Sequence, residues 1–393
     1  MSKDYLLVGV DGGATKVSAW EILYDENSKT FSLGNTNASK SYREVEDYIP
    51  NYTSININIQ LNELATTIKP TQEEEQQAGV YIETCALAIN NLVKKTGIKN
   101  VLIGLGMPGL KTEDKRGIAV LANGPRMTNY SEVLEDRLEQ LGVKIVAPIA
   151  HLGSDADYCG IGENYSDEGL FRSTENAYYL GGGTGVADAM KLKGELLPFD
   201  KAKDWIAKTW EIKNMQGLPM ERVTAVGGIQ KTYAEISGKT VEQLNAEGVY
   251  PQQVSELALN GEDAAIKTFD IVNSSIAQLL YERIVTLNQG WQNLFEFVNP
   301  NKPQPDKTHP YLNMVFDKII IGQRLGDLFE SESGVKAVKE PVIEQLNELI
   351  QNSEFISASN KKFYSNLNEI IESSKLREAP ALGAGIDAYF SKK

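Results

Sequence analysis

The sequence predicts an α/β fold built from two similar halves. Strand-like and helix-like segments alternate along the chain, and each half contains one glycine-rich turn between two strand-like segments. The chain has 393 residues, of which 41% are hydrophobic and 23% are charged, as is usual for globular proteins. At about 150 residues per domain, this length favours two or three domains, each able to bury a hydrophobic core.

The first strand-like segment is the apolar run Tyr5–Val10, and the alternating segment Val17–Ile22 follows it after a tight turn. We therefore expect a β-hairpin whose turn is Asp11–Lys16. Residues 25–70 are polar and have no strong period, which indicates loops and short strands. The role of residues 23–70 stays open between a lid, an oligomer contact and a surface elaboration.

A long helix is expected from Thr71 to Thr96. Thr71 and Glu74 have the spacing of a capping box, and Gly97 is a residue that commonly ends a helix. The rest of this half is expected to contain, in order, a strand at Asn100–Leu105, a helix at Ser131–Leu141, a strand at Val143–Ile149 and a short helix from about Asp155.

The second half repeats the opening pattern. Ala177–Leu180 predicts a strand, Gly181–Gly185 a turn, and Val186–Lys191 the returning strand. The pattern is helical from about residue 200 to 300, with the longest helix at Gly261–Gln289. The remaining expected elements are a strand at Lys318–Gly322, helices up to Ala388 and a proline-rich loop or linker at residues 299–305.

Charge and cysteine content exclude several classes of protein. The chain has 39 Lys and Arg against 53 Asp and Glu, a net charge of −14. Such a surface repels phosphate backbones and anionic lipid, so neither nucleic acid nor a membrane is expected as a partner. No apolar run approaches the length of a membrane span, and the opening residues lack the features of a signal peptide. With only Cys85 and Cys159, a disulfide framework is excluded, and we expect a soluble, reduced, cytoplasmic protein.

The first glycine turn has the composition of a phosphate-binding loop. Gly12 and Gly13 allow main-chain N–H groups to converge on phosphate oxygens. Asp11 could hold a hydrated Mg²⁺, Thr15 could donate to a phosphate, and Lys16 could offset charge on the transferred group. The alternative is a plain hairpin turn, because Asp-Gly is a common hairpin signal.

The second glycine turn favours phosphate binding. Gly182 and Gly183 follow Gly181 in a run of three glycines that costs more backbone entropy than a plain turn requires, and Thr184 and Gly185 complete the turn. The alternative is again a plain hairpin turn. Neither turn is expected to open a helix, and the motif GxxxxGK[ST] is absent, so these are not helix-type phosphate loops.

Asp155 is the candidate catalytic carboxylate. It follows a predicted strand, and the carboxyl ends of strands are where open α/β sheets bind ligands. A carboxylate there could accept the proton of an alcohol that attacks phosphorus. The alternative is a first-turn helix acid, which is the favoured interpretation for Asp157. His151 is interpreted as a loop residue, and the sequence gives no Ser-His-Asp arrangement.

In this order the segments resemble the sugar kinase, actin and heat-shock ATPase superfamily, and within it the ROK family of bacterial sugar kinases. Val8–Lys16 resembles the family's first phosphate motif, Leu180–Gly185 its second, and Ser154–Ala156 the stretch that contains its catalytic base. The other similar segments are Gly104–Gly109, Ala122–Asn123 with Asn129, Met220–Glu221 with residues 225–229, Gly261–Ala265, Ile320–Gly322 and Ala381–Ala384.

The resemblance implies a two-lobed, actin-like (ribonuclease-H-like) ATPase fold with a central cleft for nucleotide and sugar. The expected lobes are residues 1–130 and 131–393, with a C-terminal helix at about residues 378–393 packing back on the first. It also implies ATP-dependent phosphorylation of a hydroxyl of a hexose, N-acetylhexosamine or related sugar, with Asp155 as the base and Asp11 orienting Mg²⁺. By the same resemblance, the sugar contacts would be Asn123, Ser154 and Glu221, and the adenosine side would be lined by Gly322 and Leu382–Ala384.

The chain also departs from the family pattern. The family's sugar-binding His motif and its three-cysteine zinc motif are absent, and residues 198–217 stand in their place, so no zinc site and no glucose specificity are expected. Ser154 replaces the asparagine that precedes the family's catalytic Asp. A non-catalytic sensor that binds a sugar or nucleotide is therefore the alternative function. An ATPase that activates a partner enzyme is disfavoured by the cysteine count, and homodimerisation, frequent in the family, stays open.

Overall fold

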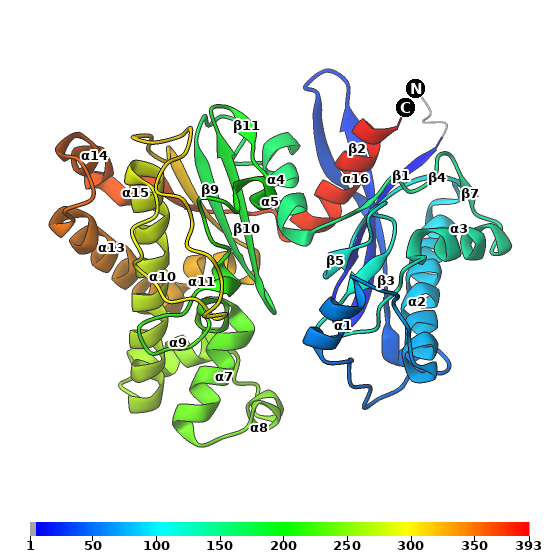
Figure 1. Cartoon of the computed structure of the whole chain (residues 1–393), viewed down its shortest axis with the longest axis horizontal. Coiled ribbons are helices and arrows are strands. Elements are labelled where there is room, and N and C mark those ends of the chain that lie inside the picture. Colours follow the sequence, from blue (N-terminus) through cyan, green and yellow to red (C-terminus); the bar gives the residue numbers. More distant parts are fainter. Residues whose placement is uncertain (1–4, 393) are drawn as a thin grey trace. The chain divides into compact units, whose positions relative to one another are not determined.

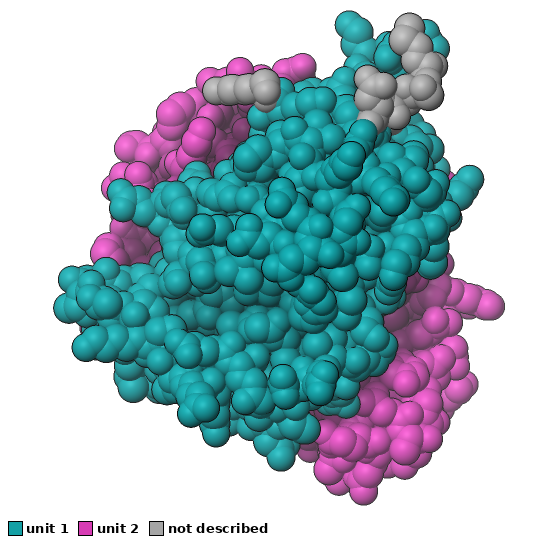
Figure 2. Space-filling model, turned by 90° about the vertical axis from the view of Figure 1, so that its right-hand side faces the viewer, with its two compact units in different colours: residues 1–169, 378–393 teal, residues 170–377 magenta. Residues whose placement is uncertain are grey.

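The structure is a computed structural model that describes residues 5–392. It divides into two units, the first of residues 1–169 and 378–393 and the second of residues 170–377 (Figure 2). The chain leaves the first unit after Gly169. The sequence had predicted this boundary near residue 130. The difference arises because the two helices that follow residue 130 pack within the first unit, one of them against the C-terminal helix.

A mixed six-stranded sheet forms the centre of the first unit. Its strands are β1 (Leu6–Gly12), β2 (Lys16–Asp25), β3 (Thr30–Ser41), β4 (Asn100–Gly106), β7 (Lys144–Ile145) and β8 (Leu152–Gly153). The order is β3-β2-β1-β4-β7, and β8 also pairs with β4. β1, β2 and β3 are antiparallel neighbours, which confirms the predicted hairpin, whereas β4 runs parallel to β1, β7 and β8.

Two long helices cover this sheet (Figure 1). Val10 of β1 lies in one hydrophobic core with the buried side chains of α2 (Gln72–Thr96). The alternate residue Gly9, and Gly104 of β4, face α16 (Ala379–Ser391): a Cβ on them would lie 1.9 and 1.8 Å from carbonyl oxygens of that helix. Because successive strand residues point to opposite faces, α2 and α16 cover opposite sides of the sheet. The two glycines of the predicted motifs thus allow α16 to pack directly on the sheet.

Residues 25–70 contain more regular structure than the sequence analysis expected. β3 pairs along its length with β2 and is followed by the short helices η1 (Tyr42–Glu44) and α1 (Ile57–Glu63). β3 is the edge strand of the sheet, where exposed polar side chains are tolerated. The only buried residue of α1 is Gln60, so this helix lacks the apolar stripe by which helices are recognised in a sequence.

The rest of the first unit follows the prediction more closely. Its remaining elements are β5 (Leu110–Lys111), β6 (Ile118–Val120), α3 (Tyr130–Gln140) and α4 (Asp155–Tyr165). β5 and β6 form a separate two-stranded sheet. α2 begins and ends as predicted, with Thr71 as its N-cap and Gly97, at φ 74°, as its C-cap. The strand expected at residues 143–149 is reduced to the two residues of β7.

The second unit repeats the topology of the first. Its strands are β9 (Ala177–Gly182), β10 (Val186–Leu192), β11 (Glu195–Leu196), β12 (Lys318–Gly322) and β13 (Ile371–Ser373). The order β11-β10-β9-β12-β13 again places three antiparallel strands beside parallel ones. The prediction of two similar halves is confirmed, although β13 was not expected.

Helices supply most of the second unit's core. The long helix α10 (Asp263–Gln289) buries seventeen residues and contacts α6, α7, α9 and α13 (Figure 1). The helices of this unit are α5 (Phe199–Ala202), η2 (Thr209–Glu211), α6 (Met220–Thr224), α7 (Val226–Ser237), α8 (Val241–Ala246), α9 (Pro251–Leu259), α10, α11 (Gln323–Glu330), α12 (Glu332–Gly334), the π-helix η3 (Val335–Lys339), α13 (Glu340–Asn352), α14 (Ala358–Phe363), η4 (Tyr364–Asn366) and α15 (Leu367–Ile370). Across residues 5–392, no helix has the length and apolar character needed to span a membrane.

Candidate functional site

The strand register brings Asp11 and Asp155 to the same edge of the first sheet. Asp11 pairs with Gly106 of β4, and Gly106 pairs with Gly153 of β8. Neighbouring strands lie about 4.8 Å apart, so the ends of three parallel strands line up in this row. Asp155 follows Gly153 by two residues, as the first residue of α4. The sequence therefore positions both carboxylates where open α/β sheets carry their ligand sites.

The start of α4 fixes the main chain around Asp155. The Ser154 hydroxyl accepts a hydrogen bond from the Asp157 N–H at 3.1 Å, so Ser154 is the N-cap of the helix. The side chain of Asp155 is exposed, and its Oδ1 accepts from the N–H of Ala156 at 3.0 Å. A carboxylate at a helix N-terminus is stabilised by the partial positive charge there. Asp155 is thus an accessible carboxylate at the N-terminus of α4.

Asp11 lies in an unfavourable electrostatic environment. Burial, followed by repulsion from the carboxylates of Asp155 and Glu378, raises the pKa of Asp11 from 3.8 to about 7, and Lys16 partly opposes the shift. Glu378 is the N-cap of α16 and was not identified from the sequence. The return of the C-terminal helix to the first unit confirms what the resemblance implied, but nothing near residue 378 in the chain indicates that this return brings Glu378 to Asp11.

Hydrogen bonds from η1 hold the first glycine turn. The Gly13 N–H donates to the Lys16 carbonyl at 3.0 Å, and Thr15 and Lys16 are exposed. The Tyr42 hydroxyl donates to the Gly13 carbonyl at 2.8 Å, and its N–H donates to the Thr15 carbonyl at 3.3 Å. Packing explains why a glycine occupies position 12, since a Cβ there would lie 1.8 Å from the sulfur of Met107. Part of the segment of unassigned role, residues 23–70, thus holds this turn.

The second glycine turn lies in the second unit, between β9 and β10. The Gly183 N–H donates to the Gly185 carbonyl at 2.9 Å, and Thr184 between them is exposed. Glu221 Oε1 accepts from the N–H of Val186 at 3.1 Å and would lie 2.6 Å from a Cβ on Gly185. Glu221, which the resemblance assigns to the sugar, therefore lies beside the second turn.

Other residues of the second unit pack closely against the same turn. A Cβ on Gly182 would lie 2.7 Å from Leu325 and 2.9 Å from the carbonyl oxygen of Thr224. A Cβ on Gly183 would lie 2.9 Å from Oε1 of Gln323, whose backbone is left-handed at φ 55°. Left-handed backbone is uncommon outside glycine and concentrates at functional positions. Gln323 was missed because side-chain type alone carries no sign of its backbone conformation.

The two segments expected on the adenosine side differ in their placement. Gly322 ends β12 opposite Gly181 of β9, next to the second turn, and is buried against the Tyr179 hydroxyl. Residues 382–384 lie inside α16 in the first unit, fully buried, and a Cβ on Gly383 would lie 1.9 Å from the Tyr158 carbonyl oxygen. Because all three residues are buried, the expectation that they line a nucleotide is wrong.

Each unit thus contains its own set of candidate residues. The first unit brings together Asp11, Lys16, Ser154 and Asp155, while Asn123 is exposed on another loop of that unit. The second unit brings together its glycine turn, Glu221 and Gly322, with Gln323 in addition. No group of three or more His, Cys, Asp or Glu within residues 5–392 could hold a metal ion alone. Mg²⁺ commonly needs only one or two protein carboxylates together with water and phosphate oxygens.

Comparison with solved structures shows which fold this is. A ROK family glucokinase from Streptomyces griseus, in complex with glucose and AMPPNP, matches 98% of this chain and 100% of its own with a TM-score of 0.57 and 15% identity. The ROK hexokinase from Thermus thermophilus matches 98% of each chain with a TM-score of 0.55 and 16% identity. A ROK family transcriptional regulator, homologous to E. coli MLC, matches 98% of this chain and 78% of its own with a TM-score of 0.54 and 11% identity.

No protein-family model matches the sequence, and a search of curated proteins gives no match. The structural likeness confirms the predicted α/β, two-lobed, ROK-like fold.

Proposed function

We propose that this protein is an ATP-dependent kinase that phosphorylates a hydroxyl of a sugar or sugar derivative of the hexose or N-acetylhexosamine class. The observation that carries the proposal is the pair of carboxylates, Asp11 and Asp155, at one edge of the first sheet, beside a glycine turn and Lys16. The fold adds support, since sugar kinases share it and one of them binds glucose together with AMPPNP.

In this proposal Asp155 is the general base. Its carboxylate accepts the proton of the acceptor hydroxyl while that oxygen forms a bond to the γ-phosphorus of ATP. The bond between the γ-phosphorus and the bridging oxygen breaks, and ADP leaves with that electron pair. The exposed carboxylate at the N-terminus of α4 is suited to this step, because it is accessible and its negative charge is favoured there.

Asp11 fits a divalent cation. It is repelled by Asp155 and Glu378, and a cation beside it would relieve that repulsion. Oxygen donors of this kind suit Mg²⁺, which when bound neutralises charge on the transferred phosphoryl group. We propose that Asp11 orients the ion through water.

The remaining candidate residues bind the two substrates in this scheme. The phosphates would contact the first turn at Gly12, Gly13, Thr15 and Lys16 and the second at Gly182, Gly183, Thr184 and Gly185, and Gly322 lies next to the second turn on the adenosine side. The exposed amide of Asn123 is available to sugar hydroxyls, and Ser154 retains a hydroxyl donor while it caps α4. For Glu221 the contact with Val186 supports a role in holding the second turn, and a sugar contact stays a prediction.

A coupled ADP-release assay tests the proposal. Mg-ATP is offered with a panel of hexoses, N-acetylhexosamines, polyols and their acids. Asp155→Asn should lower acceptor-dependent release by about 10²- to 10⁴-fold and leave ATP binding within a few fold. Asp157→Asn, two residues later in the same helix, is the matched control and should keep most of the rate. If Asp155→Asn keeps the rate with the true acceptor, the base is wrongly assigned.

The second candidate function is a non-catalytic sensor of a sugar or nucleotide. It is favoured by one observation, the transcriptional regulator with the same fold. In that case no acceptor in the panel would drive ADP release, while one sugar or ATP would still raise the melting temperature of the protein. If neither ligand shifts the melting temperature, both candidate functions fail.

A further inference from the structure

Helix α1 is held in place by a polar side chain and not by a hydrophobic core. Gln60 is its only buried residue and is fully buried, whereas Ile57, Ile59 and Leu61 on the same helix are 44–51% exposed. A helix that leaves its apolar side chains exposed and buries an amide is unusual, because burial of apolar surface is what normally docks a helix. The function of α1 therefore depends on what Gln60 contacts.

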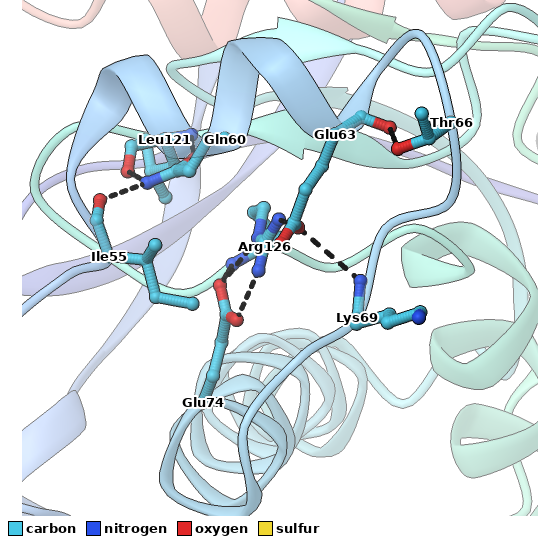
Figure 3. Close-up of polar contacts among 8 residues, drawn as sticks. All are labelled: Ile55, Gln60, Glu63, Thr66, Lys69, Glu74, Leu121 and Arg126. Atoms are coloured by element: carbon cyan, nitrogen blue, oxygen red, sulfur yellow. Dashed lines mark hydrogen bonds and ion pairs between the residues drawn. The ribbon is translucent and has the colours of Figure 1, made fainter.

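Gln60 holds both main-chain groups of Leu121. Its Nε2 donates to the Leu121 carbonyl at 3.0 Å, and its Oε1 accepts from the Leu121 N–H at 2.8 Å (Figure 3). Nε2 also donates to the Ile55 carbonyl at 2.7 Å. The amide thus pairs with Leu121 as a neighbouring strand would, at the point where the chain leaves β6. Without Gln60, two main-chain groups in a buried position would lose their partner.

The other end of the same loop is held by an ion pair. Arg126 and Glu74 are both fully buried; Nε and Nη2 of the arginine donate to the two carboxylate oxygens at 2.8 Å each, and its main-chain N–H donates to Oε1 at 3.0 Å. Figure 3 shows Arg126 between Glu74 and Glu63, which is its second ion-pair partner. Glu63 also accepts from the N–H of Lys69 at 3.4 Å.

Between these two attachments the loop is short and partly exposed. Ala122 and Asn123 are exposed, and Gly124 is packed so closely that a Cβ there would lie 2.6 Å from the Leu121 side chain. A buried ion pair is often no more stabilising than apolar packing of the same volume, but it fixes one arrangement of its partners. The polar contacts of residues 55–74 therefore serve to fix one conformation of the loop that presents Asn123.

We propose that residues 55–74 are a clamp that positions the loop Leu121–Arg126, with Gln60 as its positioning residue, so that Asn123 is held ready to bind the acceptor. The identity of what Asn123 binds rests on the function proposed above, whereas the clamp itself does not. This assigns a role to part of the segment whose role the sequence left open. Gln60 acts through the loop and not on the reacting atoms.

The matched variants are Gln60→Ala and Asn62→Ala, which remove a buried and an exposed amide from the same helix. Hydrogen–deuterium exchange of the full chain reports the clamp directly. We expect exchange of peptides covering residues 118–128 to become at least about tenfold faster in Gln60→Ala, with no change in β1, α4 or the second unit. Asn62→Ala should match the wild type. Unchanged exchange at residues 118–128 in Gln60→Ala would overturn the clamp, and so would equally faster exchange throughout the chain, because Gln60 would then stabilise the fold as a whole and not this loop.

Kinetics then tests the role in acceptor binding. With an acceptor found in the sugar panel, Gln60→Ala should raise the KM for that acceptor by about tenfold to 100-fold and leave the KM for ATP unchanged. Faster exchange without a change in acceptor KM would overturn the link between the loop and the acceptor. If the wild type releases no ADP with any sugar, the proposed kinase function fails, and the exchange result alone still supports or refutes the clamp.

Discussion

Replacing Asp11 by asparagine should make the protein more stable at alkaline pH while it removes activity. The pKa of Asp11 rises from 3.8 to about 7 on folding, chiefly through burial and then through repulsion from Asp155 and Glu378. Between about pH 4 and 7, the native protein keeps a proton that the unfolded chain has released. The contribution of Asp11 to the free energy of unfolding therefore falls as the pH rises and reaches its full unfavourable value above pH 7.

The size of this effect follows from the pKa difference. At about 1.4 kcal/mol for each pKa unit, the charged Asp11 destabilises the native state by about 4 kcal/mol at pH 8. Asparagine removes the charge but introduces an amide that needs partners, so we expect a gain of about 2 kcal/mol. For a unit of this size, that is an increase in Tm of about 4–8 °C.

Thermal unfolding followed by circular dichroism at pH 8 and pH 5 measures this difference. Asp11→Asn should be more stable than the wild type at pH 8, and the advantage should fall to less than half at pH 5, where the native carboxyl is protonated. The same variant should lose acceptor-dependent ADP release, and Mg-ATP should raise its Tm less than that of the wild type. Equal stability at pH 8, or an equal gain at both pH values, would refute the electrostatic explanation.

Two further predictions concern ion pairs away from Asp11. Arg283→Met leaves the buried Glu282 carboxylate without its cation and should lower the free energy of unfolding in urea by about 3–5 kcal/mol. The same change at Arg222, whose ion pair lies at the surface, should lower it by under about 1 kcal/mol. The prediction would be contradicted if adding Glu282→Gln to Arg283→Met recovered no stability. Asp387 raises the pKa of His151, so the pair stabilises the protein below pH 6.5 and this contribution is lost as the pH rises through the raised pKa. His151→Gln should therefore lower stability at pH 6 by under about 1 kcal/mol and by less at pH 9, and equal losses would argue against it.

The features that could be predicted from the sequence have local causes. The hairpin around Asp11–Lys16 and the second turn at Gly181–Gly185 both depend on glycines flanked by strand-forming residues. The limits of α2 depend on Thr71 and Gly97, which act on the main chain within a few residues of themselves. Glu74 marks the limit of such local prediction, because its carboxylate accepts hydrogen bonds from Arg126 and does not complete the predicted capping box.

The features that could not be predicted depend on long-range packing. The return of α16 to the first unit was implied by the resemblance, but the approach of Glu378 to Asp11 depends on how this helix packs across Gly9 and Gly104. The same packing buries residues 382–384, which the resemblance had placed next to adenosine. Gln60 in α1 has an ordinary sequence context, and its importance becomes visible only when Leu121 is brought to it.

The charge at Asp11 also separates the two candidate functions. A sensor for a neutral sugar has no use for a half-buried carboxylate that is repelled by two others. A site for phosphoryl transfer binds a divalent cation with its nucleotide, and that cation compensates the repulsion when the site is filled. In a kinase, Asp11→Asn and Asp155→Asn should both sharply lower ADP release, and Asp11→Asn should stabilise the unliganded protein more than Asp155→Asn, which removes only the repulsion between these two carboxylates. In a sugar sensor, the stabilised Asp11→Asn protein should still bind its ligand with wild-type affinity.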